Sequence, residues 1–285
     1  MVTQAVAKLV SQIGNFKSQL VATHEVHKDS WTPEKVFENA GENDIFVVTW
    51  GPLVAEHIKL IRHYRPRARI LYYAQSFGWN VRVPRGIPIA CVSRFVMSQC
   101  ALYAPENFCT YIPPPLSPHF KMKDSPRDID ILVHTRKQNN YCLKQLLPAL
   151  QAQNYKIQVL DSWLEQDQLA ALLNRTKIFL YVTELHKAGL FRRLPGEGFG
   201  LPALEAAACG ALVGSNLLGG VTDFLTPGEN CIKLQNGDLD FDLRQISAAL
   251  KHFNADELDA KNIATEYSPN VIQKKWGKLF ESLWR

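Results

Sequence analysis

The segment Glu197-Gly198-Phe199-Gly200-Leu201, followed by Pro202 and Glu205, combines two carboxylates with closely spaced glycines. Glycines let a backbone approach a ligand closely, and the free N–H groups at a helix start favour an anion such as a diphosphate. Carboxylates accept hydrogen bonds from sugar hydroxyls. The pattern therefore predicts a site for a ligand that carries both groups. A plainer interpretation stays open, in which Glu205 only favours the helix N-terminus electrostatically and the glycines make a tight turn.

Two predicted elements must position this segment. Residues 178–182 are rich in strand-forming residues, and Pro202 fits the first position of a helix over 202–209. In open parallel sheets, ligands bind beyond the carboxyl ends of the strands, where loops meet helix N-termini. The glycine-rich segment is expected at such a junction.

The rest of the chain alternates between strand and helix patterns. Strand-like runs occupy residues 44–50, 69–74, 87–92, 108–112, 130–133, 156–160, 178–182 and 211–214. Helical patterns occupy residues 5–16, 33–40, 53–64, 94–103, 141–151, 164–173, 202–209, 247–253, 256–267 and 269–284. Strands separated by helices rather than hairpin turns are expected to pair in parallel.

Four prolines between residues 113 and 118, and a charged run after them, divide this pattern into two halves. The length of 285 residues also exceeds the usual size of one domain. We therefore predict an α/β protein with two Rossmann-like domains, whose parallel sheets are flanked by helices, and a cleft between the domains. The predicted parts are a reduced N-terminal domain over 1–117, a linker over 118–128, a C-terminal domain over 129–268, and a final helix over 269–285 that could pack back on the N-terminal domain.

The composition is that of an ordinary globular protein, with 46% hydrophobic and 21% charged residues. A net charge of +5 would attract anionic ligands, and any membrane contact is expected to be peripheral. No apolar run approaches the roughly 18 to 20 residues that span a bilayer, and Met1 to Gly14 lacks the features of a signal peptide, which predicts a cytoplasmic protein. The six cysteines form no C-x-x-C pair, so neither a disulfide nor a structural metal is expected, and no nucleic-acid partner is expected.

The stretch from Glu197 through Glu205, continued by Ala206-Ala207-Ala208-Cys209-Gly210 and by Gly219-Gly220, resembles a family signature. It is similar to the E-x7-E motif and the following "EA-x-A-x-G … GG" pattern of retaining family-4 glycosyltransferases, also called glycosyl transferases group 1, which have the GT-B fold. A looser likeness extends from about Asp44 to the C-terminus. Tyr111-Ile112-Pro113 with Phe120 matches the interdomain segment of that family.

The resemblance implies a role for each matching residue. Glu197 would lie against the donor sugar near the reacting centre, and Glu205 would hold the ribose hydroxyls. Arg136 would neutralise the diphosphate leaving group, a task that suits a guanidinium, although a surface ion pair is the plain alternative for this residue. The remaining donor-binding residues would be Lys137, Gly198, Phe199, Gly200, Leu201, Gly219 and Gly220.

The implied reaction moves a sugar from a nucleotide diphosphate to an acceptor hydroxyl with retention at the anomeric carbon. It uses no metal ion and no cofactor beyond the nucleotide sugar. The acceptor would be a glycan, a lipid or a small molecule.

The chain departs from the family pattern mainly in the N-terminal half, where we find neither the family's first strand nor the glycine-rich turn that follows it. Gln75 stands where the family has a histidine beside the sugar, and Trp50, Trp79 and Arg94 are further candidates for the cleft or acceptor side. Extra residues, including His186, Lys187, Arg192 and Arg193, separate the strand over 178–182 from Glu197. Two alternatives therefore stay open: a catalytically silent partner subunit of the same fold, and a GT-B sugar-nucleotide epimerase.

Overall fold

The computed structural model describes residues 2–14, 16–21, 30–49, 51–77, 82–188, 192–195 and 197–284, with 186–188 and 192–195 described by their backbone alone. The chain divides into two compact units. Unit 1 comprises Met1–Pro115 and Pro269–Arg285, and unit 2 comprises Leu116–Ser268.

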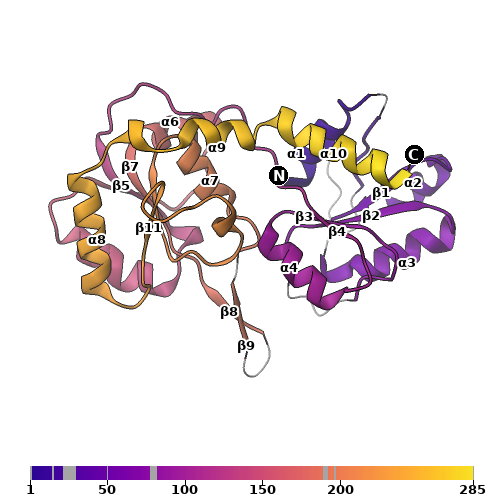
Figure 1. The fold of residues 1–285 in the computed structure, drawn as a ribbon, viewed down its shortest axis with the longest axis horizontal. Coiled ribbons are helices and arrows are strands. Elements are labelled where there is room, and N and C mark those ends of the chain that lie inside the picture. The colour runs from indigo at the N-terminus through magenta and orange to yellow at the C-terminus, as the bar shows by residue number, and fades with distance from the viewer. Residues whose placement is uncertain are drawn as a thin grey trace. The chain divides into compact units, whose positions relative to one another are not determined.

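Unit 1 is built on a four-stranded sheet in the order β1-β2-β3-β4, in which every neighbouring pair is parallel (Figure 1). The strands are β1 Ile45–Val48, β2 Arg69–Ala74, β3 Ile89–Cys91 and β4 Cys109–Tyr111. The helices are α1 Val2–Val10, α2 Pro33–Asn39, η1 Gly51–Leu53, α3 Val54–Tyr64, α4 Arg94–Tyr103 and α10 Pro269–Trp284. β2 is buried from Ile70 to Ala74, because helices cover both faces of this parallel sheet.

Helix α10 follows unit 2 in the chain and yet forms part of the core of unit 1. Trp276 is fully buried and meets Tyr73 of β2 edge-on, with ring centroids 5.1 Å apart. Phe280 lies 5.3 Å from Phe16, again between ring centroids. The two ends of the described chain therefore share one hydrophobic core.

Unit 2 is built on a five-stranded parallel sheet in the order β11-β10-β7-β5-β6. Its strands are β5 Ile129–His134, β6 Ile157–Leu160, β7 Thr176–Tyr181, β10 Leu212–Ser215 and β11 Cys231–Lys233. Its helices are η2 Thr135–Lys137, η3 Cys142–Leu146, α5 Leu147–Gln151, α6 Gln166–Asn174, α7 Leu201–Ala208, η4 Gly219–Asp223, α8 Leu239–Lys251, η5 Ala255–Glu257 and α9 Ala260–Glu266. A separate antiparallel ribbon, β8 Leu185–Ala188 with β9 Arg192–Pro195, extends from the loop after β7 (Figure 1).

The core of unit 2 follows from the strand alternation. Ile131 and Val133 on β5, together with Ile178 and Leu180 on β7, point to one face and pack on the segment of η3 and α5. The predicted α/β architecture with two helix-flanked parallel sheets is confirmed. Strand β11 and the β8–β9 ribbon were not predicted. Helix α8 begins eight residues before residue 247, where we predict its start, because the Asp238 side chain caps its first turn by accepting a hydrogen bond from Phe241 N.

The segment expected as a linker, residues 118–128, is held within unit 2. The guanidinium of Arg127 donates to the carbonyl oxygens of Leu173, Thr176 and Cys209 at 2.8 to 3.1 Å. Lys123 N also donates to Asn174 Oδ1. The end of α6, the start of β7 and the end of α7 are thereby tied to this segment.

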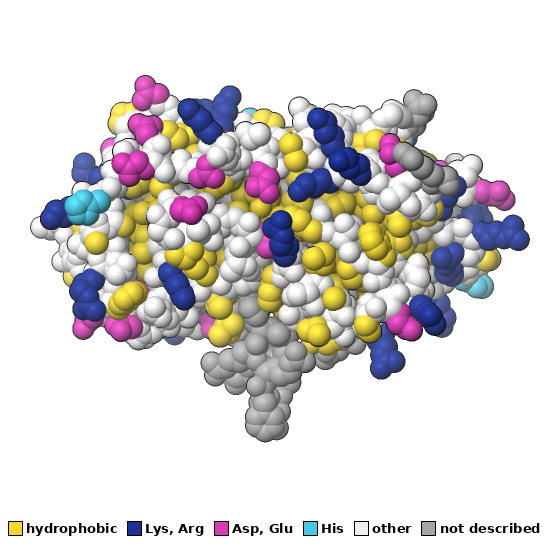
Figure 2. Space-filling model, in the orientation of Figure 1, with side chains coloured by type: hydrophobic (Ala, Val, Ile, Leu, Met, Phe, Trp, Pro, Cys, Tyr) yellow, Lys and Arg dark blue, Asp and Glu magenta, His cyan; other side chains and the backbone are white. Residues whose placement is uncertain are grey.

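Charge is dispersed on the face shown in Figure 2, where Lys and Arg alternate with Asp and Glu among exposed hydrophobic side chains. The net charge of +5 therefore forms no single basic patch on that face.

Candidate active site

The glycine-rich segment turns from the loop after β7 into helix α7, and two glycines are required there by packing within the protein. Gly200 has a φ of 98°, and a Cβ at this position would lie 2.4 Å from Val221 Cγ1. A Cβ on Gly220 would lie 2.2 Å from the carbonyl oxygen of Gly198. Turn η4 therefore presses against the loop before α7. The sequence predicts that the glycines allow close approach of a ligand, whereas at these two positions the neighbouring atoms belong to the protein.

Helix α7 begins at Leu201, directly after Gly200, and no side chain caps its N-terminus. Ala203 N and Leu204 N both donate to the carbonyl oxygen of Gly200. Pro202 carries no N–H, so the first turn offers a ligand the Leu201 N–H together with the positive end of the helix dipole. The Phe199 side chain is buried against Phe224 and Tyr267, so only its backbone can serve a ligand.

Glu197 is fixed in place by two hydrogen bonds at the carboxyl end of β7. Tyr181 Oη donates to Glu197 Oε2, and Phe199 N donates to Glu197 Oε1 at 3.3 Å. Burial, reinforced by the charge of Glu197, raises the pKa of Tyr181 well above its usual value, so the phenol stays protonated and remains a donor. The carboxylate is half-buried and preorganised without a ligand.

Glu205 lies in the second turn of α7, half-buried. Burial raises the pKa of its carboxyl to about 8, and the ammonium of Lys137 partly offsets that rise. Glu205 in turn contributes to the raised pKa of Tyr181. The structure therefore brings Glu197, Tyr181, Glu205 and Lys137 into one site in unit 2.

Arg136 and Lys137 are neighbours in turn η2 but point to different surroundings. Arg136 is exposed, its Nε donates to the Asp161 carbonyl oxygen at 3.1 Å, and its guanidinium lies 5.9 Å from the Trp163 ring centroid. Lys137 is half-buried and close enough to Glu205 to lower that carboxyl's pKa. Lys137, which we predict as a donor-binding residue, therefore lies near Glu205, whereas Arg136, which we predict at the leaving diphosphate, contacts Asp161 and Trp163.

The strand end that leads to Glu197 is held by amide side chains. Gln138 accepts from Val182 N at 2.8 Å and donates to the Leu180 carbonyl oxygen at 2.7 Å. Asn216 accepts from Thr183 N and donates to the Thr183 carbonyl oxygen. This network fixes the carboxyl end of β7, so that Tyr181 is positioned to meet Glu197.

Two residues at the carboxyl ends of the strands were absent from our predicted site. Tyr181 lies inside the run we predicted as a strand, and the signal for it was a phenol at the carboxyl end of an otherwise apolar run. His134 ends β5, is 6% exposed, and its Nδ1 has no hydrogen-bond partner among the described residues. Burial, followed by the charge of Arg136, lowers the pKa of His134, which favours a neutral imidazole.

The other predicted residues are placed as follows. Gly219 and Gly220 form the start of η4, and Gly220 N donates to the Glu197 carbonyl oxygen at 3.3 Å. In unit 1, Gln75 Nε2 donates to Thr3 Oγ1 at 2.9 Å, and the Arg94 guanidinium lies 4.6 Å from the Tyr111 ring centroid. Trp50 and Trp79 lie outside the described residues, as do the side chains of His186, Lys187, Arg192 and Arg193.

The described part of the chain holds neither a cluster of metal ligands nor a helix that could span a membrane. It contains no group of three or more His, Cys, Asp or Glu side chains that could hold a metal ion. None of its helices combines the length and apolar character needed to cross a bilayer.

Comparison with known proteins adds a family match and several structural likenesses. Residues 133–274 match the family described as glycosyl transferase-like. No curated protein matches the chain in sequence. The likenesses to solved structures below are at 14% identity or less and therefore concern the fold.

Three solved structures illustrate that fold. Sucrose-phosphate synthase from Thermosynechococcus elongatus has 13% identity and a TM-score of 0.66, covering 93% of this chain and 85% of its own. Anabaena HepE in complex with UDP and glucose has 12% identity and a TM-score of 0.67, covering 88% and 81%. A glycosyltransferase from Rickettsia africae has 14% identity and a TM-score of 0.61, covering 92% and 85%. The predicted GT-B fold, and the predicted resemblance to glycosyltransferases, are confirmed.

Proposed function

From the premise that residues 133–274 match the glycosyl transferase-like family and that the fold is GT-B, we propose that this protein is a retaining glycosyltransferase. It transfers a sugar from a nucleoside diphosphate to an acceptor hydroxyl. The nucleotide sugar is a co-substrate, and neither a metal ion nor another cofactor takes part.

The observation that carries the proposal is the group of Glu197, Glu205 and Lys137 at the start of α7. Lys137 and the N-terminal end of the α7 dipole, with the Leu201 N–H, supply positive charge for a diphosphate. A half-buried carboxyl with a pKa of about 8 is largely protonated at neutral pH, so Glu205 can lie near a diphosphate without like-charge repulsion. Such a carboxyl can both accept from and donate to ribose hydroxyls.

In the proposed reaction, bond breaking moves negative charge onto the leaving diphosphate. Lys137 and the helix N-terminus stabilise that charge, and Arg136, in the same turn η2 as Lys137, assists them. Glu197, held by Tyr181, lies beside the donor sugar as its anomeric carbon gains oxocarbenium character. The acceptor hydroxyl attacks from the face that the diphosphate leaves and gives its proton to the departing diphosphate oxygen, which retains the anomeric configuration.

The donor is proposed to be a uridine diphosphate sugar. Support comes from the solved relatives, since HepE is described in complex with UDP and glucose, and the pneumococcal O-GlcNAc transferase GtfA in complex with UDP and GlcNAc. The HepE chain is the more similar of the two, with a TM-score of 0.67 against 0.58.

The test combines donor binding with turnover. A thermal-shift screen against UDP-, GDP- and ADP-sugars should show stabilisation by the UDP sugar, because a ligand that binds only the folded state stabilises it. Lys137→Met should abolish that shift, while Lys144→Met, which removes an exposed lysine from η3, should not. Glu197→Gln should keep donor binding and lower UDP release by about 10²–10³-fold.

The outcomes separate the alternatives. Donor binding without transfer to any acceptor would favour the silent partner subunit, and an isomerised free sugar nucleotide would favour the epimerase. Absence of any stabilisation by all three donor classes refutes the proposed donor site.

A further inference from the structure

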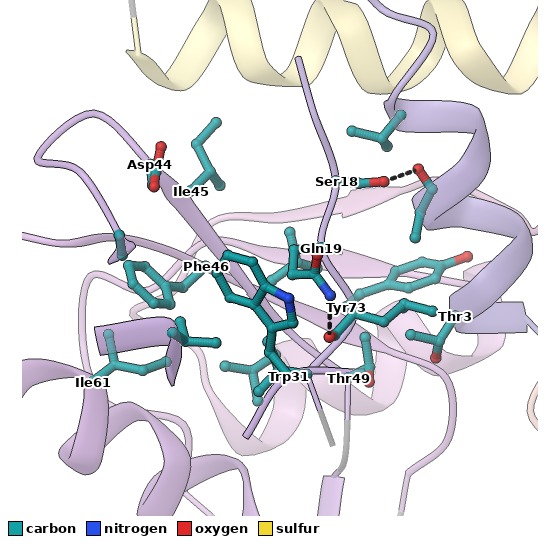
Figure 3. Close-up of a pocket in the computed structure, with 18 of the residues that line it drawn as sticks. Thr3, Ser18, Gln19, Trp31, Asp44, Ile45, Phe46, Thr49, Ile61 and Tyr73 are labelled. Atoms are coloured by element: carbon teal, nitrogen blue, oxygen red, sulfur yellow. Dashed lines mark hydrogen bonds between the residues drawn. The ribbon is translucent and has the colours of Figure 1, made fainter. Parts of the chain in front are cut away.

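Unit 1 contains a cavity of 670 Å³ along its edge strand β1, on the side of α1 and α2. Figure 3 shows Trp31, Phe46 and Tyr73 approaching it from segments far apart in the sequence. Cavities of roughly 300–1,000 Å³ are the usual size for small-molecule sites. The donor site in unit 2 does not use any of its lining residues.

The walls of the cavity are predominantly hydrophobic. Four large hydrophobic side chains that the structure leaves exposed to water, Phe16, Val21, Val47 and Leu60, are among its lining residues, each between 37% and 44% exposed. Leaving such side chains in water is unfavourable, and a hydrocarbon covering them would remove that penalty. The exposed surface is thus suited to an apolar occupant.

Four polar side chains of the lining are already engaged within the protein. Ser18 Oγ donates to the Ala7 carbonyl oxygen, and Gln19 Nε2 donates to that of Leu20 (Figure 3). Asp44 accepts from Gly41 N, and Asn39 donates to the Lys35 carbonyl oxygen. A sugar or a nucleotide needs several polar partners, and these four engaged groups do not supply them.

One end of the cavity lies at the carboxyl edge of the sheet. Thr49 directly follows β1, and Thr3 is hydrogen-bonded to Gln75, which directly follows β2. Ligand groups that react in an open parallel sheet lie at this edge. An amphiphile with its chain in the cavity would therefore present its polar end at the carboxyl edge.

We propose that this cavity binds the hydrocarbon chain of an amphiphilic acceptor. The acceptor part of this statement rests on the proposed glycosyltransferase function, whereas binding of the chain does not. The ligand class is a single-chain amphiphile with a hydroxyl-bearing head.

The test is an isothermal calorimetric titration of the whole chain with alkyl β-glucosides of increasing chain length, each kept below its critical micelle concentration. Affinity should rise by up to about fourfold per methylene and then level off when the cavity is full. Val47→Trp fills the cavity and should weaken dodecyl glucoside binding at least tenfold.

Val159→Trp is the matched control, because Val159 is 39% exposed on β6, the edge strand of the other sheet. It should leave binding unchanged. Leu60→Gln gives a second lining variant, with Leu102→Gln on α4 as its control, should Val47→Trp fail to fold. Circular dichroism and thermal midpoints check folding of all four.

Saturable binding that levels off with chain length and weakens in the lining variants supports the site. Absence of saturable binding in the folded wild type, or equal binding in a folded lining variant and its control, overturns it. UDP-sugar stabilisation is measured on the same samples. If the UDP sugar stabilises the protein but the alkyl glucosides do not bind, the cavity proposal alone is wrong. If the alkyl glucosides bind but the UDP sugar does not stabilise the protein, the cavity is a lipid site and the proposed donor site is wrong.

Discussion

Glu205→Gln should remove a pH dependence of stability that the structure gives to unit 2. The carboxyl has a pKa of about 8 in the folded protein against an ordinary 4.5, with burial as the main cause. Between these two values the folded state binds a proton that the unfolded state has released. The free energy of unfolding therefore falls as pH rises through this window, by at most about 1.4 kcal/mol per pH unit.

Over the whole window this slope would amount to about 5 kcal/mol. Water that reaches the half-buried side chain reduces it to an expected 2 to 3 kcal/mol, on the order of what a partly solvated carboxyl contributes. A glutamine of the same shape stays neutral at every pH. The variant should therefore match the wild type near about pH 5 and exceed its thermal midpoint near about pH 8.5 by roughly 4–12 °C.

Thermal unfolding of ligand-free wild type and variant at about pH 5, 6, 7 and 8.5 measures this difference. Glu229→Gln, at an exposed position in the same unit, is the control and should show no pH-dependent difference. A wild-type and Glu205→Gln pair whose midpoints differ by the same amount at both ends of the range would falsify the assignment of the raised pKa.

Three further predictions concern single contacts. Tyr181→Phe should lower sugar transfer about tenfold with little change in donor affinity, since it removes the hydrogen bond that orients Glu197; an unchanged turnover rate would contradict that role. Gly220→Ala should lower the thermal midpoint by several degrees, because its Cβ would collide with the Gly198 carbonyl. The control Gly41→Ala, whose Cβ would have no atom closer than 3.9 Å, should not lower it. Equal midpoints for the two variants would show that η4 can shift to accommodate the added methyl group. Cys109 should be the first thiol alkylated by iodoacetamide near neutral pH, since a hydrogen bond from Cys91 lowers the pKa of this half-buried thiol to about 7. Cys91→Ala should slow the alkylation of Cys109, which peptide mass spectrometry can measure.

Strand and helix patterns predicted the two sheets well, because buried parallel strands are continuous apolar runs. β7 reads Thr-Lys-Ile-Phe-Leu-Tyr and is buried at all but one of its positions. β11 escaped prediction because Cys231–Lys233 is three residues long and has only Leu234 beyond it before polar residues begin. The equally short β3 and β4 were predicted because each lies within a longer run of strand-forming residues, 87–92 and 108–112.

The site was predictable where a motif fixed it and unpredictable where packing decided. Glu197 and Glu205 could be located from their spacing, but the difference between Arg136 and Lys137 could not. Both follow β5 directly, and only the path of turn η2 sends one to the Asp161 carbonyl and the other toward Glu205. Likewise, the glycines could be recognised in the sequence, but only the structure shows that Val221 leaves no space for a side chain at Gly200.

The position of α10 has a consequence for biosynthesis. During synthesis Tyr73 cannot pack against Trp276 until the ribosome has also made residues 116–268. This delays completion of the unit 1 core by roughly 10–30 s at typical elongation rates. Unit 2 is contiguous in sequence and can fold during that interval, while the nascent sheet of unit 1 remains without part of its cover. Chaperone binding during translation should therefore concentrate on the first segment of the chain, and mutations in the last helix should damage the domain made first.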